Sequence, residues 1–177
     1  PYALNHDPAP SLAGAYSDNL ITAFRALYAY HNWLYEHPDA SVVGRYAVAG
    51  SPAYVGELAN IDYLIAHQAH FPTDPRGYDG DLQFLKITLA PRAVVGSSGT
   101  QERIGGHLLF HSGLLTVVSL NLKAYLYGSN GAVLQPGQSA GYSASSYALA
   151  EGADGQWRIY SAVALHPAGG PQSLESR

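Results

Sequence analysis

The stretch YALAEGADGQWRIY, residues 147–160, decides the fold of this chain. At its centre, Asp154-Gly155 is a dipeptide typical of tight turns between antiparallel strands. The flanking runs are rich in aromatic and small apolar residues, and they predict strands over 142–150 and 156–165. Because side chains alternate between the two faces of a strand, every second residue of the last strand is expected to face the core. This inner set is Trp157, Ile159, Ser161, Val163 and Leu165, with Arg158 and Tyr160 on the outer face.

Upstream of this hairpin, residues 82–89, 102–110 and 114–127 are also predicted to be strands. The last of them alternates most clearly between aliphatic and polar residues. We expect one face to carry Leu114, Val118, Leu120, Leu122 and Leu126. We expect the other face to carry Ser119, Asn121, Lys123, Tyr125 and Tyr127.

The first half of the chain has helical periodicity instead. It predicts helices over 17–37, 40–48 and 52–70, the first capped by Ser17 and the third by Ser51-Pro52. The third helix is expected to turn one apolar face to the core, formed by Val55, Leu58, Ile61, Leu64 and Ile65. Helices followed by antiparallel strands predict an α+β fold, with three N-terminal helices packed in a curved, mostly antiparallel sheet.

Both ends of the chain are rich in proline or glycine and have no period. We expect an extended arm over residues 1–16, one domain over 17–166 and a tail over 167–177. A single domain suits a chain of 177 residues, because domains cluster near about 100–150 residues.

Charge is scarce in this sequence. Charged residues make up 12% of the chain, about half of the usual ~25%. The formal net charge is −4 and there is no basic stripe, which disfavours a nucleic-acid partner. The absence of cysteine excludes disulfides and thiolate chemistry. A surface so poor in charge repels its neighbours weakly, which favours self-association or a protein partner.

The sequence begins at Pro1 and contains no methionine. No apolar run approaches the ~20 residues of a membrane span. We therefore expect that an upstream segment has been removed and that the chain is the mature part of an extracytoplasmic protein. A membrane anchor, if the protein has one, is expected upstream of Pro1.

The hairpin pattern Y-x-L…D-G-x-W-R-I, over 147–149 and 154–159, resembles the NTF2-like superfamily of ketosteroid-isomerase-like and SnoaL-like domains. The resemblance covers about residues 17–166. The segments 37–39, 46 and 50–54 are similar to actinobacterial extracytoplasmic proteins of membrane-anchored or lipoprotein type, and the architecture to VirB8-type periplasmic domains. This resemblance implies a cone-shaped sheet with a pocket against the helices. The superfamily includes isomerases, cyclases and hydrolases as well as non-enzymatic modules, so the fold does not settle the function.

His107 and His111 are the weak catalytic candidates, on one face of a predicted strand. An imidazole in the pocket would transfer protons near neutral pH; the alternative is two ordinary polar strand residues. Their spacing of about 14 Å along a strand disfavours a shared metal. His67 and His70 share a predicted helix but lack a third ligand. No metal and no cofactor are therefore expected.

An isomerase-like or cyclase-like pocket also needs a buried carboxylate or a histidine–aspartate pair. The candidates are Asp62, Glu57 and Glu102. We expect Asp62 on the exposed side of its helix, and Glu102 beside Arg103 is typical of a solvated ion pair. None of the three has a recognisable apolar surrounding in the sequence, which disfavours an enzyme.

The sequence contains fourteen tyrosines, a residue enriched at protein interfaces. We expect an interface on the outer sheet face formed by Tyr125, Tyr127, Asn121, Arg158 and Tyr160. The pocket is expected to be lined by Tyr28, Leu64, Trp157 and Ile159. The sequence favours a non-enzymatic extracytoplasmic module that self-associates, or binds a protein partner, through its open sheet face. A small pocket enzyme of the cyclase, isomerase or hydrolase type and a carrier of a hydrophobic ligand remain the alternatives.

Overall fold

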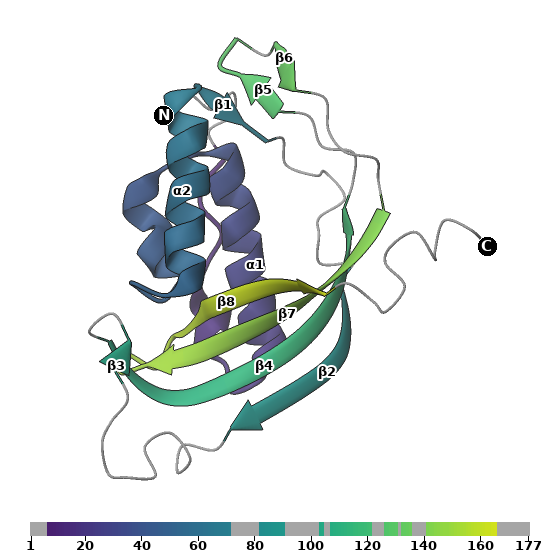
Figure 1. The fold of residues 1–177 in the computed structure, drawn as a ribbon. Coiled ribbons are helices and arrows are strands. Elements are labelled where there is room, and N and C mark those ends of the chain that lie inside the picture. The colour runs from purple at the N-terminus through teal and green to yellow at the C-terminus, as the bar shows by residue number, and fades with distance from the viewer. Residues whose placement is uncertain are drawn as a thin grey trace, which may run out of the picture.

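The structure is a computed structural model that describes residues 7–71, 82–90, 103–104, 107–121, 126–130, 132–135 and 141–165. It has an α+β fold, as the sequence predicts, with helices first and an antiparallel sheet after them (Figure 1). In the described part of the chain, two α-helices alternate with two 3-10 turns. These elements are η1 (Ala13–Tyr16), α1 (Leu20–Glu36), η2 (Ala40–Arg45) and α2 (Pro52–Ala66).

The first long helix, α1, is capped by Asn19. The side chain of Asn19 accepts a hydrogen bond from the Thr22 backbone N–H at 3.1 Å, which satisfies one free donor of the first turn. The predicted cap, Ser17, is wrong: its hydroxyl accepts from the Asn19 N–H at 3.1 Å and so supports the true cap. The helix ends at Glu36, since Pro38 disfavours a helical conformation in the residue before it.

The start of α2 confirms the predicted cap. Ser51 accepts from the Tyr54 backbone N–H at 3.2 Å, and Pro52 occupies the first helical position. The helix ends at Ala66 rather than near His70, because Gln68 has a φ of 48°, a left-handed conformation that interrupts a right-handed helix. The predicted second helix is only the short 3-10 segment η2.

The core face of α2 is narrower than predicted. Ile61 and Leu64 are buried, as expected. Val55 and Ile65, predicted on the same face, are 60% and 38% exposed. A short helix that contacts the sheet along one line has room to bury only some of its apolar residues.

Residues 7–16, predicted to be part of an extended arm, pack against the domain instead. Leu12 and Ala15 contact the hydrophobic core, and Trp33 donates from Nε1 to the Asp7 carbonyl oxygen at 3.0 Å. The Pro-rich composition concealed the 3-10 turn η1, which is too short to have a recognisable period.

The main sheet has the strand order β2-β4-β7-β8, with every neighbouring pair antiparallel. A short strand, β3, pairs with the start of β4, and a second antiparallel sheet has the order β1-β5-β6. The main sheet curves, and α1 and α2 lie on its concave side (Figure 1). The strands are β1 (Ala69–His70), β2 (Gln83–Ala90), β3 (Arg103–Ile104), β4 (His107–Asn121), β5 (Leu126–Gly128), β6 (Val133–Gln135), β7 (Gly141–Gly152) and β8 (Trp157–Leu165).

The inner face of β4 is the opposite of the predicted one. Leu115 and Val117 are 0% and 2% exposed, whereas Leu114 is 45% exposed. The predicted inner face is wrong because aliphatic residues lie on both faces of the strand here. The alternation in the sequence therefore does not determine which face is buried. Gly113 also faces inward: a Cβ at that position would lie 2.6 Å from Leu20 Cδ2. The glycine therefore lets α1 pack closely against the strand.

The strand β8 begins with its predicted inner residues, since Trp157 and Ile159 are 4% and 5% exposed. Further along the prediction is wrong, because Val163 is 57% exposed. The pairing with β7 slips by one residue at Tyr160, which is the extra residue of a β-bulge. The bulge reverses the alternation, so Ala162 rather than Val163 faces the helices.

The core between α1 and the sheet is built around Phe24, which is fully buried. Its ring stacks on Tyr28 at 5.4 Å between centroids and meets Phe84 edge-on at 5.7 Å. A third ring, Tyr147 of β7, lies at 4.7 Å. Because aromatic pairs in these geometries attract each other beyond simple burial, the cluster fixes α1 over β2 and β7.

Candidate functional site

A pocket of about 280 Å³ opens between α1, α2 and the two C-terminal strands. This volume lies near the lower end of the ~300–1,000 Å³ typical of small-molecule sites. Its polar lining comes from both helices, from the segment after η2 and from β7. The residues that carry polar groups into it are Tyr28, His31, Tyr46, Glu57, Asn60 and Tyr147.

Two of the four residues predicted to line the pocket do so in the structure, Tyr28 and Ile159. The other two, Leu64 and Trp157, lie in the hydrophobic core and are 2% and 4% exposed. Leu64 is two helical turns beyond Glu57 on α2, or about 10 Å further along the helix axis. It therefore contacts the core beyond the end of the pocket.

Helical spacing brings the polar groups together. On α1, Tyr28, His31 and Tyr35 are separated by three and four residues and so lie on one face. On α2, Glu57 and Asn60 are three residues apart. Glu57 is one of the three carboxylates predicted as candidates from the sequence, whereas His31 is not a predicted site residue. The sequence feature that could have linked Glu57 with His31 is the spacing of polar and aromatic residues by three or four positions on both α1 and α2.

Glu57 is the centre of a network of polar contacts. The Tyr46 hydroxyl donates to Glu57 Oε2 at 2.8 Å, and His31 Nε2 lies 3.5 Å from Glu57 Oε1. Behind this pair, Asn60 Nδ2 donates to the Tyr35 hydroxyl at 2.9 Å. The side chains of His31 and Glu57 are 26% and 19% exposed, so a molecule in the pocket can reach both of them.

Backbone pairing holds Tyr46 in place. The Ile159 N–H of β8 donates to the Tyr46 carbonyl oxygen at 2.8 Å, and the Val48 N–H donates to the Ile159 carbonyl oxygen at 2.9 Å. This short parallel pairing, centred on Ala47 and Ile159, joins the segment after η2 to the sheet. The Tyr46 side chain is consequently 1% exposed and is directed at Glu57.

The paired groups shift each other's pKa. Burial lowers the pKa of His31, but the contact and negative charge of Glu57, with help from Asn32, outweigh burial and raise it above its ordinary value. Burial raises the pKa of Glu57, but His31, Tyr46 and Tyr35 outweigh burial and lower it. Glu57 is therefore ionised at neutral pH, and His31 keeps its proton to a higher pH than a free imidazole does.

The pocket tyrosines keep their protons. Burial, followed by the charge of Glu57, raises the pKa of both Tyr35 and Tyr46. Burial also raises the pKa of Tyr147, with contributions from Tyr28 and Glu57. These hydroxyls are thus neutral hydrogen-bond donors at physiological pH.

The pocket therefore combines an ionised carboxylate, a protonatable imidazole and neutral phenol donors. Such a set can bind the polar group of a small molecule and can pass a proton to or from it. Within the described ranges, no group of three or more histidine, aspartate or glutamate side chains is placed to hold a metal ion.

The predicted catalytic residues, His107 and His111, belong to β4, but their side chains fall outside the described residues. The same is true of the side chains of Asn121 and Tyr127, and Tyr125 lies outside altogether. Their proposed roles stay predictions.

His67 and His70 do not share a helix face. His67 follows the end of α2, stacks on Tyr63 at 4.0 Å and places Nδ1 2.8 Å from the Tyr63 carbonyl oxygen. His70 belongs to β1, is 4% exposed and places Nδ1 3.3 Å from the Phe71 carbonyl oxygen. The expected helical spacing is wrong because α2 ends at Ala66.

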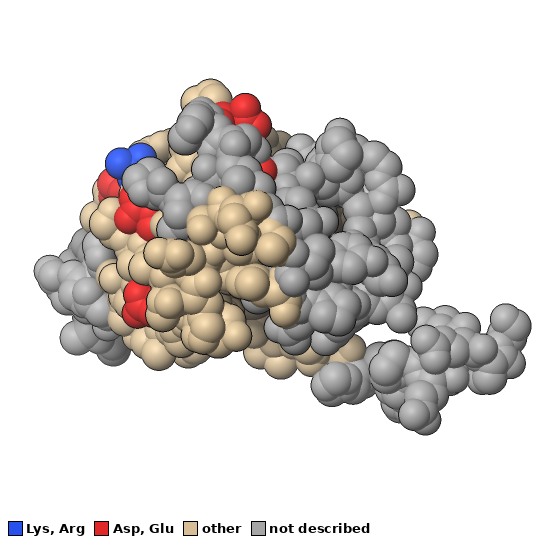
Figure 2. Space-filling view, turned by 90° about the horizontal axis from the view of Figure 1, so that it is seen from above, with Lys and Arg blue, Asp and Glu red and all other residues tan. Residues whose placement is uncertain are grey.

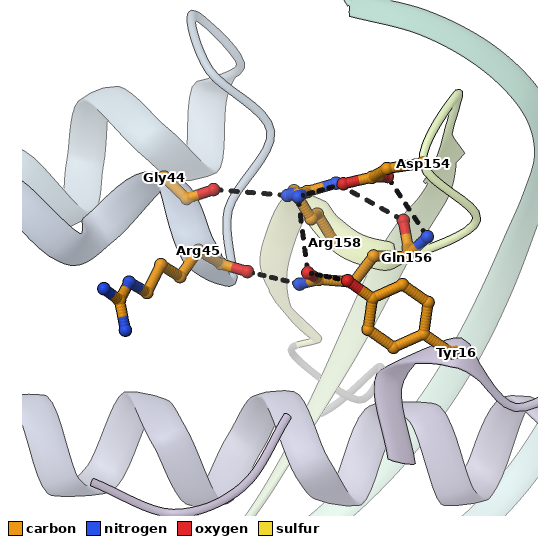
Figure 3. Close-up of polar contacts among 6 residues, drawn as sticks. All are labelled: Tyr16, Gly44, Arg45, Asp154, Gln156 and Arg158. Carbon is orange, nitrogen blue, oxygen red and sulfur yellow. Dashed lines mark hydrogen bonds and ion pairs between the residues drawn. The ribbon is translucent and has the colours of Figure 1, made fainter. Parts of the chain in front are cut away.

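Arg158, predicted to lie at an interface, makes its contacts within the chain (Figure 3). Its guanidinium donates to both carboxylate oxygens of Asp154, at 2.7 and 3.0 Å. Its Nε donates to the carbonyl oxygen of Gly44 at 3.2 Å. These bonds join the turn between β7 and β8 to η2.

Gln156 extends this network (Figure 3). Its Nε2 donates to the carbonyl oxygen of Arg45, and its Oε1 accepts from the Tyr16 hydroxyl at 3.4 Å. Tyr160, the other described residue of the predicted interface, is half-buried against Val48 and Ala150. The hairpin that decides the fold therefore also secures η1 and η2, and with them the segment that carries Tyr46.

Replacing Arg158 with glutamine is expected to lower the free energy of unfolding by about 1–3 kcal/mol, because the change removes several hydrogen bonds to a charged group. Asp154→Asn is the matched control. It should cost less, under about 1 kcal/mol, since the Asp154 side chain is 47% exposed. Denaturant unfolding at neutral pH measures both variants. Wild-type stability in Arg158→Gln would contradict the role of this network.

The described surface carries little charge. On the face seen in Figure 2, acidic side chains are scattered over the described part, and the one small group of basic atoms lies beside acidic ones. This agrees with the composition, and the described part of that face has no basic patch for a nucleic acid. None of the helices within the described ranges is both long and apolar enough to cross a membrane.

No family model and no curated protein matches this sequence. The NTF2-like resemblance of the hairpin over 147–160 therefore stays a prediction.

Proposed function

We propose that this domain binds a small organic molecule in the pocket, with Glu57 and His31 as the polar anchors. The observation that carries the proposal is the position of this pair. A purely structural ion pair would be sealed in the core or placed at the outer surface. Here both side chains line a cavity and keep 26% and 19% exposure, in the arrangement of an apolar pocket with a few convergent polar groups.

A glycine on α2 supports the same proposal. Gly56 lines the pocket, and nothing lies within 4 Å of the place where a Cβ would be. Glycine in a helix interior costs about 1 kcal/mol relative to alanine. Alanine would fit at this position, so the glycine lowers helix stability and leaves the cavity open. Such a loss of stability is common at functional sites.

We further propose that the domain is a cone of the NTF2-like type. Three features support this proposal: helices that precede the sheet, a sheet that curves around them (Figure 1), and a pocket between the two layers.

A fragment screen by ligand-observed NMR tests the binding proposal. We expect flat, mostly apolar fragments with one polar group to bind the wild type. The substitution Ala162→Phe should weaken them by about tenfold or more, a loss of about 1.4 kcal/mol, because the new ring enters the pocket. Val163→Phe is the matched control, since Val163 is the next residue and lies on the opposite face. Equal binding by wild type and Ala162→Phe would contradict the proposal.

The outer face of the sheet supports a second function. Leu114, Val163 and Leu165 are 45%, 57% and 39% exposed. Val163 belongs to a cross-strand row with Ser146, Thr116 and Lys86, in which Lys86 of β2 is the one charged residue. None of the described helices covers this face (Figure 1). Because an uncovered sheet face with exposed apolar side chains and little charge is suited to contact with a protein, we propose that the face binds a second copy of the chain or another protein, in the expected extracytoplasmic setting.

The double substitution Leu114→Lys and Val163→Lys is expected to abolish self-association, because a desolvated, unpaired lysine is costly in an interface. Sedimentation velocity over a wide range of protein concentrations measures the change. As a control, Val55→Lys adds one positive charge at a position of α2 that is 60% exposed and should leave association intact; the single substitution Val163→Lys, at 57% exposure, matches it in charge and should weaken association. A wild type that stays monomeric throughout would contradict self-association through this face.

A further inference from the structure

We infer that the pocket takes a compact organic cation, such as a quaternary ammonium group, held beside the Glu57 carboxylate by the rings of Tyr28 and Tyr147. This inference rests on the proposed function, because it names the ligand class of the same pocket. Charge, ring chemistry, hydrogen bonding and size each support it.

The charge of the pocket favours a cation. Glu57 is the only permanently charged residue among the described residues that line it. Its negative charge acts on the titratable groups around it: it helps to raise the pKa of His31, Tyr46 and Tyr147. Each of these shifts favours the more positive form of the group. A cavity with this potential attracts cations and repels anions.

Aromatic rings provide the second element. The face of a tyrosine ring attracts a cation within about 6 Å of its centroid. His31 already occupies such an environment, stacked on Tyr28 and edge-on to Tyr46, with centroids 5.9 Å away in both pairs. Its protonated imidazole is a cation among rings beside Glu57. A ligand cation in the adjoining cavity would meet the same kind of surroundings.

Hydrogen bonding narrows the class further. Each carboxylate oxygen of Glu57 already has a partner, Tyr46 at 2.8 Å for Oε2 and His31 at 3.5 Å for Oε1. A quaternary ammonium has no N–H group, so it leaves these contacts in place and binds through charge and ring faces alone. At about 280 Å³ the pocket suits a trimethylammonium group with a short substituent.

His31 links this binding to pH. Protonated His31 neutralises Glu57 and repels a second cation, so a bound cation favours the neutral imidazole. The groups that face His31 are Glu57 from α2, Tyr46 from the segment after η2, and Tyr28, Asn32 and Tyr35 from α1 itself. Because the tyrosines stay protonated, affinity for a cation is expected to rise as the pH rises through the pKa of His31.

Choline and its uncharged carbon isostere, dimethylbutanol, test this inference by NMR titration at pH values on both sides of the His31 transition. At the higher pH we expect choline to bind about tenfold more tightly or better. Glu57→Gln should remove this preference. Tyr147→Leu should weaken choline, whereas Tyr147→Phe keeps the ring and should retain most of the affinity. His31→Gln should make choline binding nearly independent of pH.

The outcomes separate the inference from the function on which it rests. Equal or tighter binding of dimethylbutanol, or no binding of choline by a pocket that binds other fragments, overturns the ammonium inference alone. A pocket that binds no fragment at all overturns the proposed function as well. If Glu57→Gln does not fold, the pH profile of choline binding to the wild type carries the test: binding that weakens as the pH rises overturns the inference.

Discussion

Replacing Phe24 with alanine is expected to lower the free energy of unfolding by about 3–5 kcal/mol. The side chain is fully buried, and its ring contacts Tyr28 of α1, Phe84 of β2 and Tyr147 of β7. Alanine would leave a cavity where the first helix meets the sheet. Since a domain is usually stable by only about 5–15 kcal/mol, the change removes a large fraction of the total. Urea denaturation followed by circular dichroism measures it.

Two controls identify the cause of this loss. Phe24→Leu keeps an apolar side chain of intermediate size and should cost less than alanine, because part of the cavity stays filled. Leu85→Ala removes an apolar side chain from a position that is 63% exposed and should cost less than about 0.5 kcal/mol. A loss below about 1 kcal/mol for Phe24→Ala would contradict the central place of this ring in the core.

Replacing Glu57 with glutamine is expected to move the pKa of His31 from above its ordinary value to below it. Glu57 supplies the contact and charge that raise this pKa, and without them burial, which lowers it, dominates. Histidine-selective NMR across the pH range measures the transition. Tyr46→Phe is the control: it removes one donor to Glu57 but keeps the carboxylate, so the His31 pKa should stay raised.

The same pair makes stability depend on pH. The raised pKa of His31 contributes stability that is fully present below about pH 6.5, the unfolded value, and is lost as the pH rises through the folded value. The lowered pKa of Glu57 contributes stability that is present above about pH 4.5 and is lost as the pH falls through the folded value. The pair therefore stabilises the fold most between these limits, and Glu57→Gln should lose this pH-dependent part of the stability.

A His31 pKa that Glu57→Gln leaves unchanged would contradict the pairing of the two side chains.

The two proposed surfaces are compatible. The pocket lies between the helices and the concave side of the sheet, whereas Leu114, Val163 and Leu165 are exposed on the other side. Self-association through the outer face would therefore leave the pocket open to a ligand.

Local signals in the sequence predicted much of the fold. Asp154-Gly155 gave the hairpin, and Ser51-Pro52 gave the start of α2. Alternation failed in β4, where Leu114 and Leu115 are adjacent and equally apolar. Alternation failed again beyond Tyr160, where the strand has a β-bulge. A bulge arises from the pairing of two strands, so the sequence of one strand does not predict it.

The candidate site was much harder to predict. Glu57, His31 and Tyr46 come from two helices and the segment after η2, and only their packing brings them within contact distance. No local sequence motif predicts a contact between residues of three separate segments. Glu57 lies among Val55, Leu58 and Ala59 in the sequence, but the groups that shift its pKa, His31 and Tyr46, come from other segments.

A small molecule is proposed to bind beside Glu57 and His31. NMR of protein with isotope-labelled histidine and tyrosine, saturated with a fragment selected by binding, tests this proposal. We predict that the His31 imidazole and the Tyr28 and Tyr147 rings shift and show nuclear Overhauser contacts with the fragment. Fragments that bind while these resonances stay unchanged, or no fragment that binds at all, would contradict the claim.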